Sequence, residues 1–245
     1  RTTLNRLKTL CNDAGYKVYY GHTDSVFVGI PSPEVGQELV HALNAQMKPI
    51  EVEFEKWCDR MLLMAKNRYA GNVVWSDGAG HPPKLYIKGI EMKQSRMPQI
   101  MKDSMNGIIG GILSNTEEKQ ITNNIKELVV KVTTGDIEKT KLCMKGKLER
   151  NLTEYKQLSG ASAGAEWANE YLGKGYRAGS FFLVTLNEKG KYMAFDDPEE
   201  LDGLYEIGYK ELANRFILKK IQPYYEMMGW DLQPLHNVIE GKGRL

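Results

Sequence analysis

Two runs of aromatic and β-branched residues, separated by a short polar segment, constrain the fold of this chain more than any other feature. The stretch YKVYYGHTDSVFVGI spans residues 16–30, and its polar centre runs from Gly21 to Ser25. Apolar runs on either side of a short polar segment are typical of a β-hairpin. The sequence therefore predicts a rigid hairpin that carries Asp24, a carboxylate suited to Mg²⁺, at its turn. A plain solvated turn is the competing interpretation.

Helical and strand patterns around the hairpin indicate an α+β unit. Residues 1–14 place leucines at helical spacing, and residues 32–47 open with the Ser-Pro pair typical of a helix start. Later strands are predicted over residues 50–57, 61–75 and 84–92, with a turn-rich connector over 76–83. We expect an antiparallel sheet with helices on one face.

The composition changes near Pro98, where long helical patterns begin. Helices are predicted over residues 100–113, 117–135, 161–174 and 202–230, the last interrupted by Pro223, and strands at the start of 142–158 and over 180–186. We therefore expect three parts, with boundaries at residues 1–97, 98–236 and 237–245. The second part is mostly helical, and the third is a poorly ordered tail.

The bulk composition excludes several classes of protein. With 42% hydrophobic and 26% charged residues, the 245-residue chain has the composition of a soluble globular protein. Its net charge of +2 gives no overall signal for nucleic acid, although local clusters remain. Three scattered cysteines without a CxxC pair argue against a zinc ribbon or a disulfide framework and fit a reducing cytoplasm. No apolar run approaches the ~18 residues of a membrane span, and the initial arginine suggests a processed or trimmed product.

Two basic segments are candidates for contacts with phosphate groups. In KNRYAGN, Lys66 and Arg68 would share one face of a strand, with Tyr69 on the other. In KLYIKGIEMKQS, Lys88 and Lys93 alternate with apolar residues, and Gly89 would permit close approach of another backbone. Cations on one strand face suit nucleic-acid phosphates. A solvated strand face is the alternative for both segments.

Two acidic residues form a further candidate. Glu53 and Glu55 alternate within IEVEFEKW, so both would lie on one face of a strand and look toward one cation. The alternative is that both residues lie on the solvent-exposed face of an ordinary sheet.

Three segments, taken in order, carry a resemblance to a known family. They are YGHTDS at residues 20–25, KNRYAG at 66–71 and KGIE at 88–91. They resemble the motif C hairpin (YGDTDS), the KKRYAG strand and the KGxE segment of B-family DNA polymerases. Downstream, residues 148–186 look like the thumb of that family. The chain thus resembles the second half of a polymerase palm, at residues 1–97, followed by a thumb at 98–236.

The resemblance implies a partner, because other parts of the family's machinery do not occur in the sequence. There is no motif A, no fingers helix and no set of 3′–5′ exonuclease carboxylates. The chain is therefore similar to the small subunit of a split archaeal or phage polymerase, or to a fragment of a longer chain. It would be active only with a large chain that supplies motif A, fingers and exonuclease. Primer–template DNA, dNTP and a sliding clamp are the other implied partners, and no membrane is expected.

The family's chemistry assigns expected roles to residues of this chain. By resemblance, Asp24 contributes to a two-metal Mg²⁺ site for nucleotidyl transfer, with Glu53 and Glu55 as accessory metal ligands. His22 and Thr23 complete the catalytic turn. The implied DNA-binding residues are Lys66, Asn67, Arg68, Tyr69, Lys88, Lys93, Lys145, Lys147, Lys156 and Arg177.

Two departures from the family pattern favour an alternative function. His22 occupies the position of the family's first motif C aspartate, and imidazole is a poorer Mg²⁺ ligand than carboxylate. Asn67 replaces the second lysine of KKRY, which removes a cation and offers an amide that can bond a base edge. The alternative is a non-catalytic DNA-binding or architectural subunit derived from a polymerase.

Overall fold

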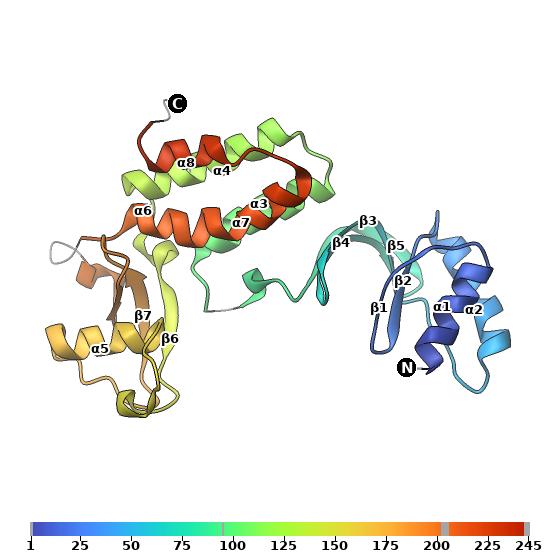
Figure 1. The fold of residues 1–245 in the computed structure, drawn as a ribbon, viewed down its shortest axis with the longest axis horizontal. Coiled ribbons are helices and arrows are strands. Elements are labelled where there is room, and N and C mark those ends of the chain that lie inside the picture. Colours follow the sequence, from blue (N-terminus) through green and yellow to red (C-terminus); the bar gives the residue numbers. More distant parts are fainter. Residues whose placement is uncertain (1, 95, 202–205, 243–245) are drawn as a thin grey trace. The chain divides into compact units, whose positions relative to one another are not determined.

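The chain divides into two compact units, which are described separately. The computed structural model describes residues 2–94, 96–201 and 206–242 (Figure 1). Unit 1 spans Arg1–Gly89 and unit 2 spans Ile90–Leu245. Both units contain helices and antiparallel sheets, so the predicted α+β class is confirmed.

Unit 1 begins with a helix, a hairpin and a second helix, as predicted. Their bounds are α1 Thr2–Asp13, β1 Val18–His22, β2 Ser25–Val28 and α2 Pro33–Met47. The Ser32 hydroxyl accepts a hydrogen bond from the Val35 N–H at 3.5 Å and caps α2, with Pro33 at the first helical position. Leu7 and Cys11 of α1 pack with Leu39 and the rest of the α2 stripe against apolar side chains of the hairpin. Both helices therefore support the hairpin.

A three-stranded antiparallel sheet completes unit 1. Its order is β3 (Lys56–Ala65), β4 (Arg68–Ser76) and β5 (Ala79–Lys88). Two-residue turns join the strands, at Lys66-Asn67 and at Asp77-Gly78. Asn67, Asp77 and Gly78 all have positive φ, of 64°, 53° and 80°, as tight hairpin turns require.

Three predictions in this region are wrong in detail. Residues 61–75 are two strands and a turn rather than one strand, and the expected connector at 76–83 is mostly the start of β5. Residues 51–55 are not a strand. The physical reason is a contact with α2, because the Asn44 side chain bonds both backbone groups of Val52, the N–H at 2.7 Å and the C=O at 3.0 Å. Those groups are then not available to a neighbouring strand.

Unit 2 combines a helical part with a small sheet. Its helices are α3 Gln99–Leu113, α4 Glu118–Thr134, α5 Ala161–Leu172, α6 Tyr209–Leu212, α7 Lys219–Met228 and α8 Gln233–Ile239. Its short helical turns are η1 Glu91–Lys93, η2 Lys139–Leu142, η3 Leu152–Glu154, η4 Pro198–Leu201 and the π-helical η5 Ala213–Leu218. Its strands are β6 Met144–Lys147, β7 Phe181–Leu186 and β8 Tyr192–Phe195, in the order β6-β7-β8.

The helices of unit 2 share one core, and its sheet has another beneath α5. In Figure 1, α3 lies beside α4 and α7, and α8 lies along α4. Ile108, Ile109 and Val129 are fully buried in this helical part. Helix α5 covers one face of the sheet, where Ala165 and Ala168 pack against Val184. Strand β8 was not predicted, and it makes unit 2 less purely helical than expected.

The end of the chain differs from the expectation. Residues 237–239 form the last turn of α8, where Val238 is buried, so the predicted poorly ordered tail is wrong there. Residues 243–245 lie outside the described part. Pro223 does not interrupt the helix, because it lies inside α7, which continues from Lys219 to Met228.

Within residues 2–94, 96–201 and 206–242, no helix combines the length and the apolar character that crossing a membrane requires.

Candidate functional site

The turn between β1 and β2 consists of two residues, Thr23 and Asp24. His22 pairs with Ser25 across the strands, so the turn is tighter than the five-residue polar segment suggests. Thr23 has a φ of 41°, in the left-handed region. Both turn residues are exposed. Asp24 therefore presents its carboxylate to solvent from the end of a paired and supported hairpin.

His22 is oriented by its two neighbours on the hairpin. The Thr23 hydroxyl lies 2.8 Å from His22 Nδ1, within hydrogen-bonding distance. The rings of His22 and Tyr20 are parallel to within 5°, with centroids 6.4 Å apart. His22 and Tyr20 thus lie on the same side of β1.

Tyr20 ties the hairpin to the turn between β3 and β4. Its hydroxyl accepts a hydrogen bond from the Asn67 N–H at 2.9 Å and donates one to Asn67 Oδ1 at 2.7 Å. On the other side, a Cβ atom added to Gly89 would lie 1.8 Å from the Asn67 carbonyl oxygen. Only a glycine fits there, and its φ of 69° also favours glycine. The three motifs of the sequence therefore meet at the backbone of Asn67.

An aromatic cluster lies beneath this junction. Tyr69 is 5% exposed, and its ring meets the edge of Phe27 at 4.9 Å and lies 6.1 Å from both Tyr20 and Tyr86. Burial, followed by the neighbouring Tyr86, raises the pKa of Tyr69 to about 12, so its phenol stays neutral. Tyr69 supports the junction from inside the packed sheet.

Three cations lie at the same end of the sheet. Lys66 is exposed in the turn rather than on a strand face, which corrects the expectation that it alternates with Arg68 along one strand. Arg68 is the first residue of β4, and it is exposed. Lys88 is exposed near the end of β5, directly opposite Tyr69 of β4. The sheet therefore brings Lys66, Arg68 and Lys88 together beside the Tyr20–Asn67 junction.

The predicted metal ligands are not gathered into one complete site. Glu53 and Glu55 are exposed in the irregular segment before β3, and Glu55 pairs with Lys56 at 3.3 Å. Glu55 is still near enough to contribute to the raised pKa of Tyr69. Within the described residues, no three Asp, Glu, His or Cys side chains are placed to hold one metal. Asp24 fits Mg²⁺ as a hard oxygen donor, but as a single ligand that others must complete.

Sequence analysis missed Lys8 as a member of this region. A Cβ atom on Gly21 would lie 2.5 Å from Lys8 Cε and 3.0 Å from Lys8 Nζ. The Lys8 side chain therefore lies over the hairpin backbone next to the Thr23-Asp24 turn. Its position depends on how α1 packs on the hairpin, which the sequence does not reveal. The glycine inside β1 was the available signal.

The remaining predicted DNA-binding residues belong to unit 2. Lys145 and Lys147 lie two residues apart on β6, and Lys147 pairs with Glu149 at 3.0 Å. Lys156 and Arg177 are exposed in loops. Lys93 closes η1, and its side chain lies outside the described part.

Comparisons with known proteins agree on one family. The family profile described as "DNA polymerase family B" matches residues 2–174. The curated "DNA polymerase" of Archaeoglobus fulgidus is 24% identical over 152 residues, which cover 61% of this chain and 18% of that protein. The "DNA polymerase alpha catalytic subunit" of Mus musculus is 25% identical over 242 residues, which cover 91% of this chain and 16% of that protein.

A solved structure shows the same fold. The family B DNA polymerase from the hyperthermophilic archaeon Pyrobaculum calidifontis matches 94% of this chain with a TM-score of 0.69 and 20% identity. The match covers 29% of that chain. The chain therefore spans less than a third of the length of each of these polymerases.

Proposed function

Because the chain belongs to DNA polymerase family B, we propose that it supplies palm and thumb parts of a template-directed DNA polymerase. Residues 1–97 would form the second half of the palm, and residues 98–236 the thumb. The observation that carries the proposal is the junction at Asn67, where Tyr20 bonds both its backbone and its side chain and Gly89 lies against its carbonyl oxygen. This junction holds the Asp24 hairpin beside the cations at the end of the sheet.

Asp24 is the proposed catalytic metal ligand, with Glu53 and Glu55 as accessory ligands. When Mg²⁺ is bound, it would stabilise the charge that develops as the primer 3′-OH attacks the α-phosphate of a dNTP. Asp24 suits the task because its carboxylate is exposed on a turn fixed by two paired strands. His22 and Thr23 would shape the turn through their mutual contact at 2.8 Å.

The basic residues provide the proposed grip on primer–template DNA. Lys66 and Arg68 would hold the primer terminus, and Lys88 would follow the duplex beyond it. In unit 2, exposed Lys145 and Arg177 would contact phosphates in a sequence-independent way. Tyr69 and Asn67 would position this grip, since both are engaged in contacts within unit 1.

The site needs residues from outside the given sequence. Asp24 is one donor, and the described residues offer no group of three that could complete a metal site. We propose that motif A, fingers and exonuclease come from a large partner chain or from the remainder of a longer polypeptide. A sliding clamp is a further proposed partner of the assembled enzyme.

The test is primer extension by the assembled polymerase with Asp24→Asn in this chain. We expect extension to fall by at least about 100-fold, because a direct metal ligand contributes no less than the residues that support one. Binding of the isolated chain to primer–template DNA should be unchanged or slightly tighter, since the substitution removes a negative charge near phosphates. Asp77→Asn, in the turn between β4 and β5, is the matched control and should leave extension unchanged.

A non-catalytic, architectural role is the second candidate. It is favoured by His22, which holds a carboxylate position of the family and is engaged with the Thr23 hydroxyl at 2.8 Å. Under this alternative, the Asp24→Asn enzyme would extend primers at the wild-type rate. The same assay with this chain omitted would then show whether the chain supplies only affinity for DNA.

A further inference from the structure

Phe181 is the most exposed of the large apolar side chains in the described part of the chain. It is the first residue of β7, and 72% of it is accessible to solvent. Its partner across the strands is Lys147 of β6, whose ammonium group lies 5.5 Å from the centre of the Phe181 ring. A single exposed apolar residue is ordinary. An exposed ring with a cation at its face also takes part in a cation–π contact.

The backbone on both sides of Phe181 is firmly held. The Gly179 N–H donates to the Leu148 carbonyl at 2.8 Å, and the Leu148 N–H donates to the Ser180 carbonyl at 3.1 Å. The Ser180 hydroxyl accepts from the Arg177 N–H at 3.0 Å, and the Ser180 N–H donates to the Arg177 carbonyl at 2.9 Å. The exposed Phe181 side chain is therefore carried by a hydrogen-bonded turn and strand.

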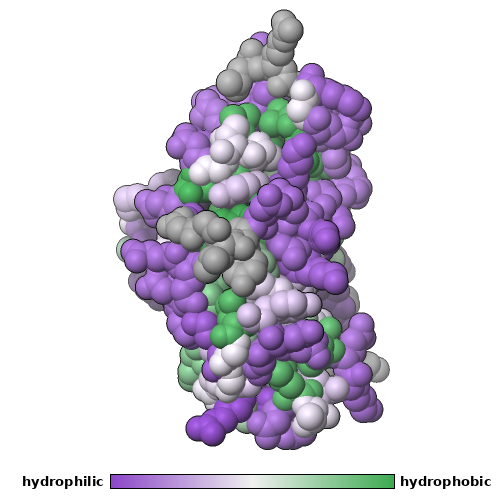
Figure 2. All heavy atoms as spheres, turned by 90° about the vertical axis from the view of Figure 1, so that its left-hand side faces the viewer, coloured by the Kyte–Doolittle hydropathy of each residue, from purple (hydrophilic) through white to green (hydrophobic). Residues whose placement is uncertain are grey.

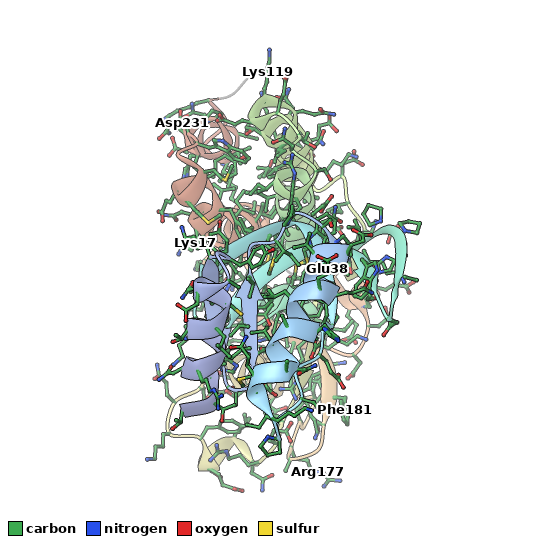
Figure 3. The ribbon with its side chains drawn as sticks, turned by 90° about the vertical axis from the view of Figure 1, so that its right-hand side faces the viewer. Lys17, Glu38, Lys119, Arg177, Phe181 and Asp231 are labelled. Atoms are coloured by element: carbon green, nitrogen blue, oxygen red, sulfur yellow. The ribbon has the colours of Figure 1, made fainter. Side chains whose placement is uncertain are left out.

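Further cations belong to the segments next to Phe181. Lys145 lies two residues before Lys147 on β6 and is therefore on the same face of the sheet. Arg177 belongs to the turn before β7, and Figure 3 shows it near Phe181. Arg96 lies beside β6, where its carbonyl accepts a hydrogen bond from the Lys145 N–H at 3.2 Å.

The Glu149 carboxylate pairs with two of these four cations. Glu149 pairs with Lys147 at 3.0 Å and with Arg96 at 3.3 Å. The set of Lys145, Lys147, Arg96, Arg177 and Glu149 therefore keeps a net charge of +3. On the face drawn in Figure 2, apolar residues lie in separate patches among hydrophilic ones. A single exposed ring beside cations suits a small planar ligand better than a large apolar partner.

We infer that Phe181 is a stacking platform for an unpaired base of single-stranded DNA, with Lys145, Lys147 and Arg177 on the flanking phosphates. The inference rests on the proposed function and adds a feature of the substrate. A flat exposed ring on a strand next to cations combines the two contacts that single strands use, base stacking and phosphate neutralisation. Inside a duplex both faces of each base are covered by neighbouring pairs. Phe181 therefore discriminates in favour of an unpaired segment, such as a template overhang.

The experiment compares two DNA probes of equal length, a single strand of about 12 nucleotides and a blunt duplex, by fluorescence anisotropy with the whole chain at one salt concentration. Phe181→Leu keeps an apolar side chain but removes the ring. Phe181→Trp keeps a ring and adds a fluorophore whose quenching reports stacking, read as the difference from the four native tryptophans. Tyr171→Leu is the matched control, because Tyr171 is another exposed aromatic residue of unit 2, at 62% exposure.

We expect Phe181→Leu to weaken binding of the single strand about fivefold to tenfold and binding of the duplex less than twofold. Phe181→Trp should retain the affinity for the single strand and be quenched by it, and Tyr171→Leu should change neither affinity. An equal effect of Phe181→Leu on both probes, or none, would overturn the inference while leaving the proposed function intact. If the wild-type chain binds neither probe, the inference and the proposed grip on DNA both fail.

Discussion

Gly89→Ala gives the most direct test of the junction at Asn67. The added Cβ atom would start 1.8 Å from the Asn67 carbonyl oxygen, whereas real contacts of this kind begin near 3.0 Å. The obstacle is backbone rather than a flexible side chain, so the turn between β3 and β4 has to move. The same movement pulls Asn67 away from the Tyr20 hydroxyl, which bonds it at 2.9 and 2.7 Å.

The expected loss of stability has two parts. A left-handed backbone, here with φ of 69°, costs an alanine about 1–2 kcal/mol relative to glycine. Weakening two hydrogen bonds to Tyr20 costs about 1–2 kcal/mol more, because each contributes about 1 kcal/mol. We therefore expect the opening free energy of the β3–β5 sheet to fall by about 2–4 kcal/mol.

Gly78→Ala separates the two parts. Gly78 lies in the other turn of the same sheet with a φ of 80°, and an added Cβ would meet nothing within 4 Å. It should therefore lose only the conformational part, about 1–2 kcal/mol. Hydrogen exchange of the β4 amides, followed by mass spectrometry, measures the opening of this sheet in both variants.

The comparison can refute the reasoning directly. If Gly89→Ala and Gly78→Ala destabilise the sheet equally, the close approach to Asn67 contributes nothing. A larger loss for Gly89→Ala that disappears in a Tyr20→Phe background would show that the hydrogen bonds transmit the effect. The Tyr20→Phe variant lacks the hydroxyl, so neither hydrogen bond to Asn67 exists in it.

Three further predictions concern unit 2, and the last of them concerns its helical core. Lys145→Ala should weaken DNA binding and reduce the slope of log affinity against log salt by about 1, measured by anisotropy at several salt concentrations, whereas an unchanged slope would exclude a phosphate contact. The Lys174 ammonium lies 2.8 Å from the Asp196 carboxylate, and together with the Tyr176 hydroxyl it lowers the pKa of Asp196 in the folded state. The ion pair therefore stabilises the fold at pH values above the usual carboxyl pKa. This stabilisation is lost as the pH falls through the lowered pKa of the folded state. The difference in urea midpoint between wild type and Lys174→Met should therefore become smaller as the pH is lowered from about 6 to about 2. A difference that stays constant over this range would contradict the prediction. Ile109→Ala should cost about 2–5 kcal/mol in urea unfolding because Ile109 is fully buried, and a loss below about 1 kcal/mol would mean that the helical core closes around the gap.

The elements predicted correctly are those with local causes. Ser32 and Pro33 fix the start of α2 through one hydrogen bond and one preset φ. Gly135 ends α4 in the left-handed conformation that glycine readily adopts. The family was also predicted correctly, because its three motifs are short segments whose residues can be compared one by one.

The elements predicted wrongly depend on contacts between distant residues. Val52 lies in an alternating segment, but the Asn44 side chain from α2 takes both of its backbone groups. The turn at Lys66-Asn67 has neither glycine nor proline, so the apolar run on both sides looked like one strand. Asparagine is the one residue there that adopts the left-handed conformation readily, and that signal is weak without knowledge of Tyr20 and Gly89.

The junction explains why three short motifs, each weak alone, are specific in combination. Tyr20, Asn67 and Gly89 come from the three motifs, and both Tyr20 and Gly89 make their contacts with Asn67. A change in one alters the geometry required of the other two. In this chain Asn67 stands where the family motif has a lysine. The positive charge is lost, but the asparagine accepts a hydrogen bond from Tyr20 and readily adopts a φ of 64°. The turn is thereby pre-organised, and under the proposed function the charge that would hold a primer comes from its neighbours Lys66 and Arg68.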